Sequence, residues 1–137
     1  MGQIPPGFEG FARDILEKCQ GLGVELRLDL DAEAVADVLA QVKVVYLPFP
    51  DGISERRGTA MAAMANGAIV LTTAGRHTTP TLRDAVRVVP AENALQAIAQ
   101  TLSSDEDALA RQQSAAKTYL REHIPTSWDA VARAYLN

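Results

Sequence analysis

The sequence predicts an α/β domain built on a parallel sheet of about four strands, and three observations lead to this prediction. Short apolar segments alternate along the chain with segments whose apolar residues recur at helical spacing. Two of the short segments, 44–49 and 68–73, are almost continuously apolar, which is typical of parallel strands covered on both faces. Glycine or proline punctuates the boundaries between segments. Strands that alternate with helices in this way form α/β folds.

The N-terminal part of the chain is expected to form two helices and one strand. Residues 7–20 form an amphipathic helix, on whose buried face the single cysteine packs as a core thiol. The segment 24–28 alternates apolar and charged residues, which predicts a strand near a sheet edge. Asp31 caps the next helix, which runs to about residue 42. The residues expected on the buried faces of these helices are Phe8, Phe11, Ile15, Cys19, Val35, Val38, Leu39 and Val42.

The middle of the chain is expected to supply the centre of the fold. Residues 58–66 form an alanine-rich helix that can lie close to the sheet, with Met61 and Met64 as core residues. Gly67 ends this helix. A polar loop over 74–84 then leads to a short strand at 85–90.

The rest of the chain is expected to be helical. A helix over 91–102 buries Leu95, Ile98, Ala99 and Leu102. Ser104 and Asp107 form a capping box for a helix that reaches about residue 122. Thr126 and Asp129 form a second box for a final helix, whose docking face carries Trp128, Val131, Ala132 and Tyr135.

Composition excludes several classes of function. The 137 residues suffice for one domain with its own core, without disulfides or metal. A balance of 13 basic and 17 acidic residues argues against a nucleic-acid binder. No apolar run is long enough to span a membrane, and the first residues lack the layout of a signal peptide. One cysteine fits a reducing compartment, so we expect a cytoplasmic protein. No cluster of residues has metal-ligand spacing, and no cofactor is expected.

The strongest functional signal lies between the strand at 44–49 and the helix at 58–66. Arg56 and Arg57 stand directly before Gly58 and Thr59, at the expected start of that helix. Backbone N–H groups, the helix dipole and two guanidinium groups suit a phosphate or diphosphate. The rest of the candidate site comprises Asp51, Gly52, Ser54 and Glu55. The alternative is a solvated loop in which the arginines pair with Asp51 or Glu55.

A second polar loop follows the next strand and is expected at the same edge of the sheet. It contributes Arg76 and His77 as further candidates for contact with a phosphate-bearing ligand. The alternative is that both side chains are simply exposed.

Motifs in a fixed order extend this signal along the chain. An apolar strand ends in proline at 44–48, an Asp-Gly pair follows at 51–52, the helix reads AAMANG at 62–67, and a strand ends in threonine at 69–73. Gly75, VVPAEN at 88–93 and SWDAVARAYLN at 127–137 follow. In this order and spacing, residues 20–137 resemble the C-terminal, donor-binding half of the retaining GT-B glycosyltransferases, the clan that includes glycogen and sucrose synthases.

The resemblance implies a Rossmann-like fold and a site for a nucleotide-sugar donor. It assigns the diphosphate to Arg56, Arg57 and the backbone around Gly58, and the sugar acceptor to a separate N-terminal domain. Many members of the clan carry two glutamates where this chain has Ser54 and Ala62, and the second of them usually holds the ribose. Glu55 or Asp51 is a possible substitute for the first. The clan's two opening strands and their basic pair have no counterpart here, nor has the acceptor domain.

These departures imply a partial GT-B C-terminal domain that binds a nucleotide sugar or nucleoside diphosphate weakly and does not catalyse transfer alone. Because the missing strands lie at the centre of the clan's sheet, we expect apolar strand edges that associate, and hence a homodimer. The alternative function is a non-catalytic module that keeps the fold and uses its exposed sheet edge for self-association or for a partner.

Overall fold

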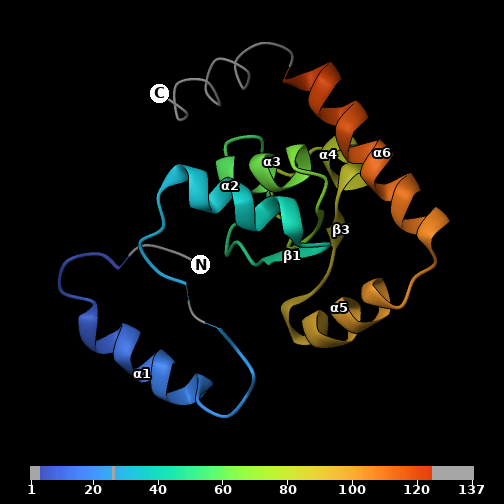
Figure 1. The fold of residues 1–137 in the computed structure, drawn as a ribbon. Helices are drawn as coiled ribbons and strands as arrows, with labels where there is room; N and C mark the ends of the chain where they lie inside the picture. Colours follow the sequence, from blue (N-terminus) through green and yellow to red (C-terminus); the bar gives the residue numbers. More distant parts are fainter. Residues whose placement is uncertain (1–3, 26, 125–137) are drawn as a thin grey trace. The chain divides into compact units, whose positions relative to one another are not determined.

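The structure is a computed structural model that describes residues 4–25 and 27–124 (Figure 1). The chain divides into two compact units, Met1–Val35 and Ala36–Asn137, and the boundary falls within helix α2 (Ala32–Gln41). The expected final helix, with Thr126, Asp129 and its docking face, lies outside the described residues.

The first unit contains helix α1 (Glu9–Cys19), close to the range expected for it. Its expected buried face is wrong. Phe8 and Phe11 are 56% and 64% exposed, and the Cys19 thiol is only half-buried rather than part of a core. A unit of this length has too few residues to build a core that could cover them.

The strand expected at 24–28 is also wrong. Among the described residues of this segment, only Leu28 makes an isolated bridge, and the backbone conformation at Asp29 has a positive φ of 53°. The two charges that produce the alternating pattern pair with each other, Arg27 Nε to Glu25 Oε1 at 2.9 Å. Val24 is 55% exposed, so the segment lacks the buried face that stabilises a strand. The cap at Asp31 is confirmed, because its Oδ1 accepts a hydrogen bond from the Ala34 amide at 2.8 Å.

The second unit is an α/β fold around a parallel sheet, as expected, but the sheet has three strands rather than four. Its order is β1 (Val44–Leu47), β2 (Ile69–Thr72) and β3 (Arg87–Val88). Val44 pairs with Ile69 and Leu71 pairs with Arg87. Both strands expected from continuous apolar residues are present. The central strand β2 is buried throughout, as expected, whereas β1 is only half-buried because it lies at the edge of the sheet.

Helices cover the two faces of this sheet (Figure 1). On one face, α3 (Gly58–Ala65), α4 (Pro80–Ala85) and α6 (Glu106–His123) pack together, and α3 and α6 contact β2. On the other, α5 (Ala94–Leu102) packs against β1 and β2. The cluster on the α5 face comprises Ile69, Leu71 and Val89 with Val44, Tyr46, Ala97, Ile98 and Leu109 around them. Met61 and Met64 are buried in the α3 layer, as expected, and Gly67 ends α3 with a φ of +86°.

Three expectations for the later elements need correction. The loop expected at 74–84 contains α4, which Thr79 caps by accepting a hydrogen bond from the Leu82 amide. Helix α5, which follows a 3₁₀ turn (Ala91–Asn93), leaves Leu95 and Leu102 85% and 57% exposed, and Ala99 is exposed as well. The face that packs inward is the neighbouring one, with Ala94, Ala97, Ile98 and Thr101. Helix α6 is capped by Asp105, not by Ser104, whose hydroxyl donates back to the Gln100 carbonyl. Within residues 4–25 and 27–124, no helix has both the length and the apolar character needed to cross a membrane.

Candidate functional site

Two loops meet at the carboxyl edge of the sheet. The first joins β1 to α3 over residues 48–57, and the second joins β2 to α4 over residues 73–79. Because β1 and β2 run parallel, both loops leave the same edge. This is the edge at which open parallel sheets bind ligands. The loop that carries Arg76 and His77 therefore lies beside the first loop, as the sequence predicted.

The loops touch through the backbones of two glycines. A Cβ atom added to Gly52 would lie 2.0 Å from the amide nitrogen of Gly75, and one added to Gly75 would lie 2.0 Å from the Asp51 carbonyl oxygen. Gly52 also adopts a φ of +81°, which favours glycine. Both positions therefore require glycine, and of the two the sequence singled out only Gly52 as a site residue.

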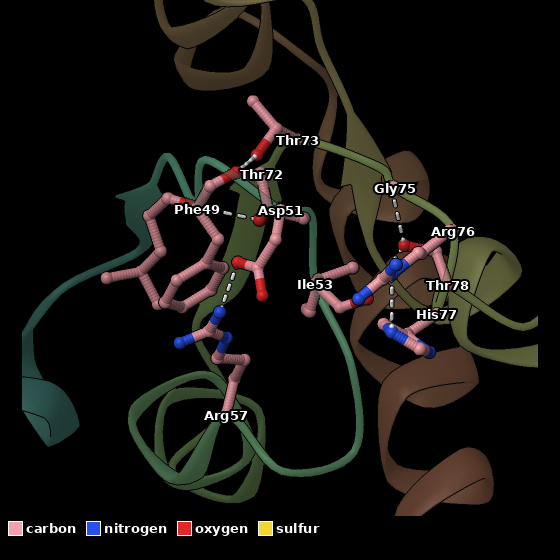
Figure 2. Close-up of polar contacts among 11 residues, drawn as sticks. Phe49, Asp51, Ile53, Arg57, Thr72, Thr73, Gly75, Arg76, His77 and Thr78 are labelled. Atoms are coloured by element: carbon pink, nitrogen blue, oxygen red, sulfur yellow. Dashed lines mark hydrogen bonds and ion pairs between the residues drawn. The ribbon is translucent and has the colours of Figure 1, made fainter.

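Threonine side chains fix the two loops to each other. The Thr73 hydroxyl donates to the Phe49 carbonyl at 2.5 Å, and the Thr78 hydroxyl donates to the Ile53 carbonyl at 2.7 Å (Figure 2). The Ile53 amide in turn donates to the Thr73 carbonyl at 2.9 Å. Ile53 itself is fully buried. The sequence did not predict these contacts. For Thr73, its position directly after the end of β2 is a signal that could have indicated one.

The two arginines of the candidate site lie in different environments. Arg57 Nη2 forms an ion pair with Asp51 Oδ1, and its guanidinium carbon lies 4.8 Å from the centre of the Phe49 ring (Figure 2). The Arg57 side chain keeps 35% of its surface exposed, and Arg56 is exposed. The ion pair with Asp51 is the contact expected if the loop is only a solvated charged segment.

Helix α3 begins directly after these arginines. Its first turn holds no acidic residue, and Arg57 at the cap position makes no side-chain capping bond. Within this turn the Gly58 amide donates to the Arg56 carbonyl at 3.2 Å, and Thr59 is exposed. The positive end of the helix dipole therefore lacks a neutralising carboxylate in its own first turn.

Glu55 is held by a residue of helix α6. The Tyr119 hydroxyl, on α6, donates to Glu55 Oε1 at 3.0 Å. Burial, and then the hydrogen bond and charge of Glu55, raise the pKa of Tyr119 to about 12. Ser54, the remaining candidate of this loop, is half-buried. The structure thus brings Glu55 to α6 rather than to an arginine.

Arg76 and His77 pair with each other. Arg76 Nε donates to His77 Nε2 at 2.8 Å (Figure 2). Both side chains are exposed, and Figure 2 shows them on the opposite side of Ile53 from Arg57. Of the candidate residues, the structure brings together Asp51 with Arg57 and, separately, Arg76 with His77.

In the described part of the chain, no three His, Cys, Asp or Glu side chains are grouped so that they could hold a metal ion. Comparisons with protein-family models, with curated proteins and with solved structures found no match to this chain. The chemistry of the site is therefore argued from its own residues.

Proposed function

We propose that this chain is a donor-binding domain of the retaining GT-B glycosyltransferase type, which binds a nucleoside diphosphate or nucleotide sugar weakly and transfers no sugar by itself. One observation supports this most strongly. Two adjacent arginines precede a helix start that has no acidic residue in its first turn, at the carboxyl edge of a parallel sheet. Amides at a helix start and guanidinium groups bind phosphate, and guanidinium groups bind it bidentately. The single cysteine fits a cytoplasmic site of action.

The contacts of Arg57 imply that this binding is weak. A phosphate that uses the Arg57 guanidinium must compete with the Asp51 carboxylate, which already pairs with it. The side chain need not leave the Phe49 ring, because a guanidinium stacked on an aromatic face keeps its edge free for hydrogen bonds. Arg56, which is exposed, can turn to a ligand without breaking a buried contact. We expect a dissociation constant in the millimolar range.

Isothermal titration calorimetry with uridine diphosphate and adenosine diphosphate tests the proposal. Arg57→Ala should remove the binding that the unmodified chain shows, because the guanidinium supplies charge and paired N–H groups to the diphosphate. Arg111→Ala provides the matched control, since Arg111 is exposed on α6 and does not belong to either loop. Equal binding by both variants, or no heat of binding at millimolar ligand, would contradict the proposal.

A second function, self-association, is favoured by strand β1. Within the described residues β1 pairs only with β2, and all four of its residues are half-buried. A strand with one open edge can pair with the same strand of a second copy. Light scattering behind size exclusion at micromolar concentration should then give a dimer that dissociates on dilution. A monomer that binds the diphosphate would support the first function and exclude this one.

A further inference from the structure

Tyr119 makes a contact that packing alone does not require. Its side chain is buried, with 3% of its surface exposed, yet its hydroxyl reaches a carboxylate 64 residues away in the sequence, Glu55 Oε1 at 3.0 Å. The ring stacks on His123 one turn later in α6, with 4.6 Å between ring centres and 13° between planes. The stack fixes the ring, so the hydroxyl is held at one point.

Glu55 occupies a segment that is otherwise held by short-range contacts. In the turn 54–57, the Arg57 amide donates to the Ser54 carbonyl at 3.0 Å, and the next amide, Gly58, donates to the Arg56 carbonyl at 3.2 Å. The ion pair of Arg57 with Asp51 also stays within the same loop. Before this turn, the last link to the second loop is at Ile53, through Thr73 and Thr78.

At its end the turn runs into α3, where the Arg57 carbonyl accepts hydrogen bonds from the Ala60 and Met61 amides at 3.0 and 3.2 Å. The Tyr119 bond adds a long-range side-chain contact that ties the turn to α6. It is a hydrogen bond to a charged acceptor, the stronger kind. It starts from α6, which also packs against α3 and β2. The bond therefore connects the turn to the helical layer against which α3 itself packs.

We infer that Tyr119 is a positioning residue, whose hydroxyl holds Glu55 and thereby fixes the turn that presents Arg56 and Arg57 in front of α3. We call the Tyr119–Glu55 hydrogen bond the tether; it is a contact of the structure. Its consequence for ligand binding rests on the proposed function. Tyr119 does not touch the ligand in this arrangement. Its role is to keep the two guanidinium groups near the helix start.

Backbone amide exchange in the ligand-free chain tests the tether, with Tyr119→Phe as the variant. Phenylalanine keeps the ring and its stack on His123 and removes only the hydroxyl. A charged hydrogen bond of ordinary strength predicts exchange about tenfold faster at the Arg57 and Gly58 amides, which are hydrogen-bonded within the turn. Amides of β2 should exchange as before. Tyr46→Phe, which removes a hydroxyl from β1, is the control and should leave the turn unchanged. Unaltered exchange at the Arg57 and Gly58 amides in Tyr119→Phe would overturn the inference.

Changes at Glu55 separate the tether from a general loss of stability. Glu55→Gln keeps an oxygen acceptor for the hydroxyl and should preserve slow exchange, whereas Glu55→Ala should reproduce Tyr119→Phe. Combining Tyr119→Phe with Glu55→Ala should add nothing further, because both remove the same bond. Additive effects in the double variant would overturn the inference.

Titration of the same variants with uridine diphosphate tests the consequence. Tyr119→Phe should weaken binding several-fold and Tyr46→Phe should not. Unchanged affinity in a variant with a loosened turn would overturn the positioning role. No binding by the unmodified chain would instead refute the proposed function, while the exchange measurements would still decide whether the tether exists.

Discussion

Replacing Gly52 with alanine should destabilise the second unit more than any other glycine-to-alanine change in it. The new methyl group would lie 2.0 Å from the Gly75 amide nitrogen and 2.4 Å from the Ala74 carbonyl carbon. These are backbone atoms, so neither can rotate away. The two loops must separate, and their hydrogen bonds through Thr73 and Ile53 must lengthen.

The cost has two parts. A side chain at a φ of +81° costs about 1–2 kcal/mol. Forcing an extra methyl into a packed contact costs about 1–3 kcal/mol. Together these give a loss of about 2–5 kcal/mol in the free energy of unfolding. In a unit of this size such a loss lowers Tm by about 10 °C or more.

Alanine variants of two other glycines measure the backbone cost and the steric cost separately. Gly67 has a φ of +86° but no atom within 4 Å of an added Cβ, so Gly67→Ala should show the backbone cost alone. Gly75 has the close contact, 2.0 Å to the Asp51 carbonyl oxygen, and is not among the glycines with a positive φ. Thermal unfolding followed by circular dichroism gives the three values. A loss for Gly52→Ala no larger than that for Gly67→Ala would refute the close contact of the loops.

Two further predictions concern charges at the site and beneath it. Asp51→Asn should tighten binding of uridine diphosphate about three- to tenfold. The change releases Arg57 from an ion pair worth about 0.2–1 kcal/mol. It also removes the repulsion between the Asp51 carboxylate and the diphosphate, about 0.5 kcal/mol for charges about 8 Å apart in water. Calorimetry with Asp107→Asn as control checks this, and unchanged affinity would contradict it. The pKa of Tyr119 is raised from 10.0 to about 12 in the folded chain. The contribution of its protonated hydroxyl to the free energy of unfolding is therefore fully present below pH 10 and is progressively lost as the pH rises toward 12. Urea unfolding across pH 9–12 should show the stability advantage over Tyr119→Phe shrinking by at most about 3 kcal/mol, and an advantage that stays constant would refute the shift.

The central strands and the helix between them were predictable from local pattern. Continuous apolar residues at 44–47 and 69–72 leave a strand no solvated face, and the alanines of α3 allow close packing on the sheet. The segment 24–28 misled because alternation describes a strand only where a neighbouring layer covers the apolar side, and Val24 is exposed. The five residues of this segment do not indicate whether another layer of the fold covers their apolar side.

Helix ends and rotations depended on smaller signals. The sequence Thr79-Pro80 is a capping residue followed by proline at the first helical position, which would have predicted α4. Ser104 and Asp105 are both good capping residues, and the structure uses the second. Leu95 was misplaced because Ala94, Ala97, Ile98 and Thr101 recur at the same helical spacing as the expected face, so periodicity alone does not choose between the two faces.

The meeting of the two candidate loops at the sheet edge was predictable, and the contacts within them were not. A charged glycine loop after a buried strand indicated the sheet edge, and the two loops do lie together there. Arg57 pairs with Asp51, as expected if the loop is only a solvated charged segment. Glu55 instead accepts a hydrogen bond from a residue that is distant in the sequence. Tyr119 is 64 residues from Glu55, and no local pattern connects them.

Chemical-shift mapping by two-dimensional NMR with millimolar uridine diphosphate tests the central claim most directly. We predict shifts concentrated on the backbone amides of residues 54–59, above all Gly58 and Thr59, with the amides of α5 unchanged. Shifts spread over unrelated surfaces, or an unchanged spectrum from a folded chain, would contradict a diphosphate site at the start of α3.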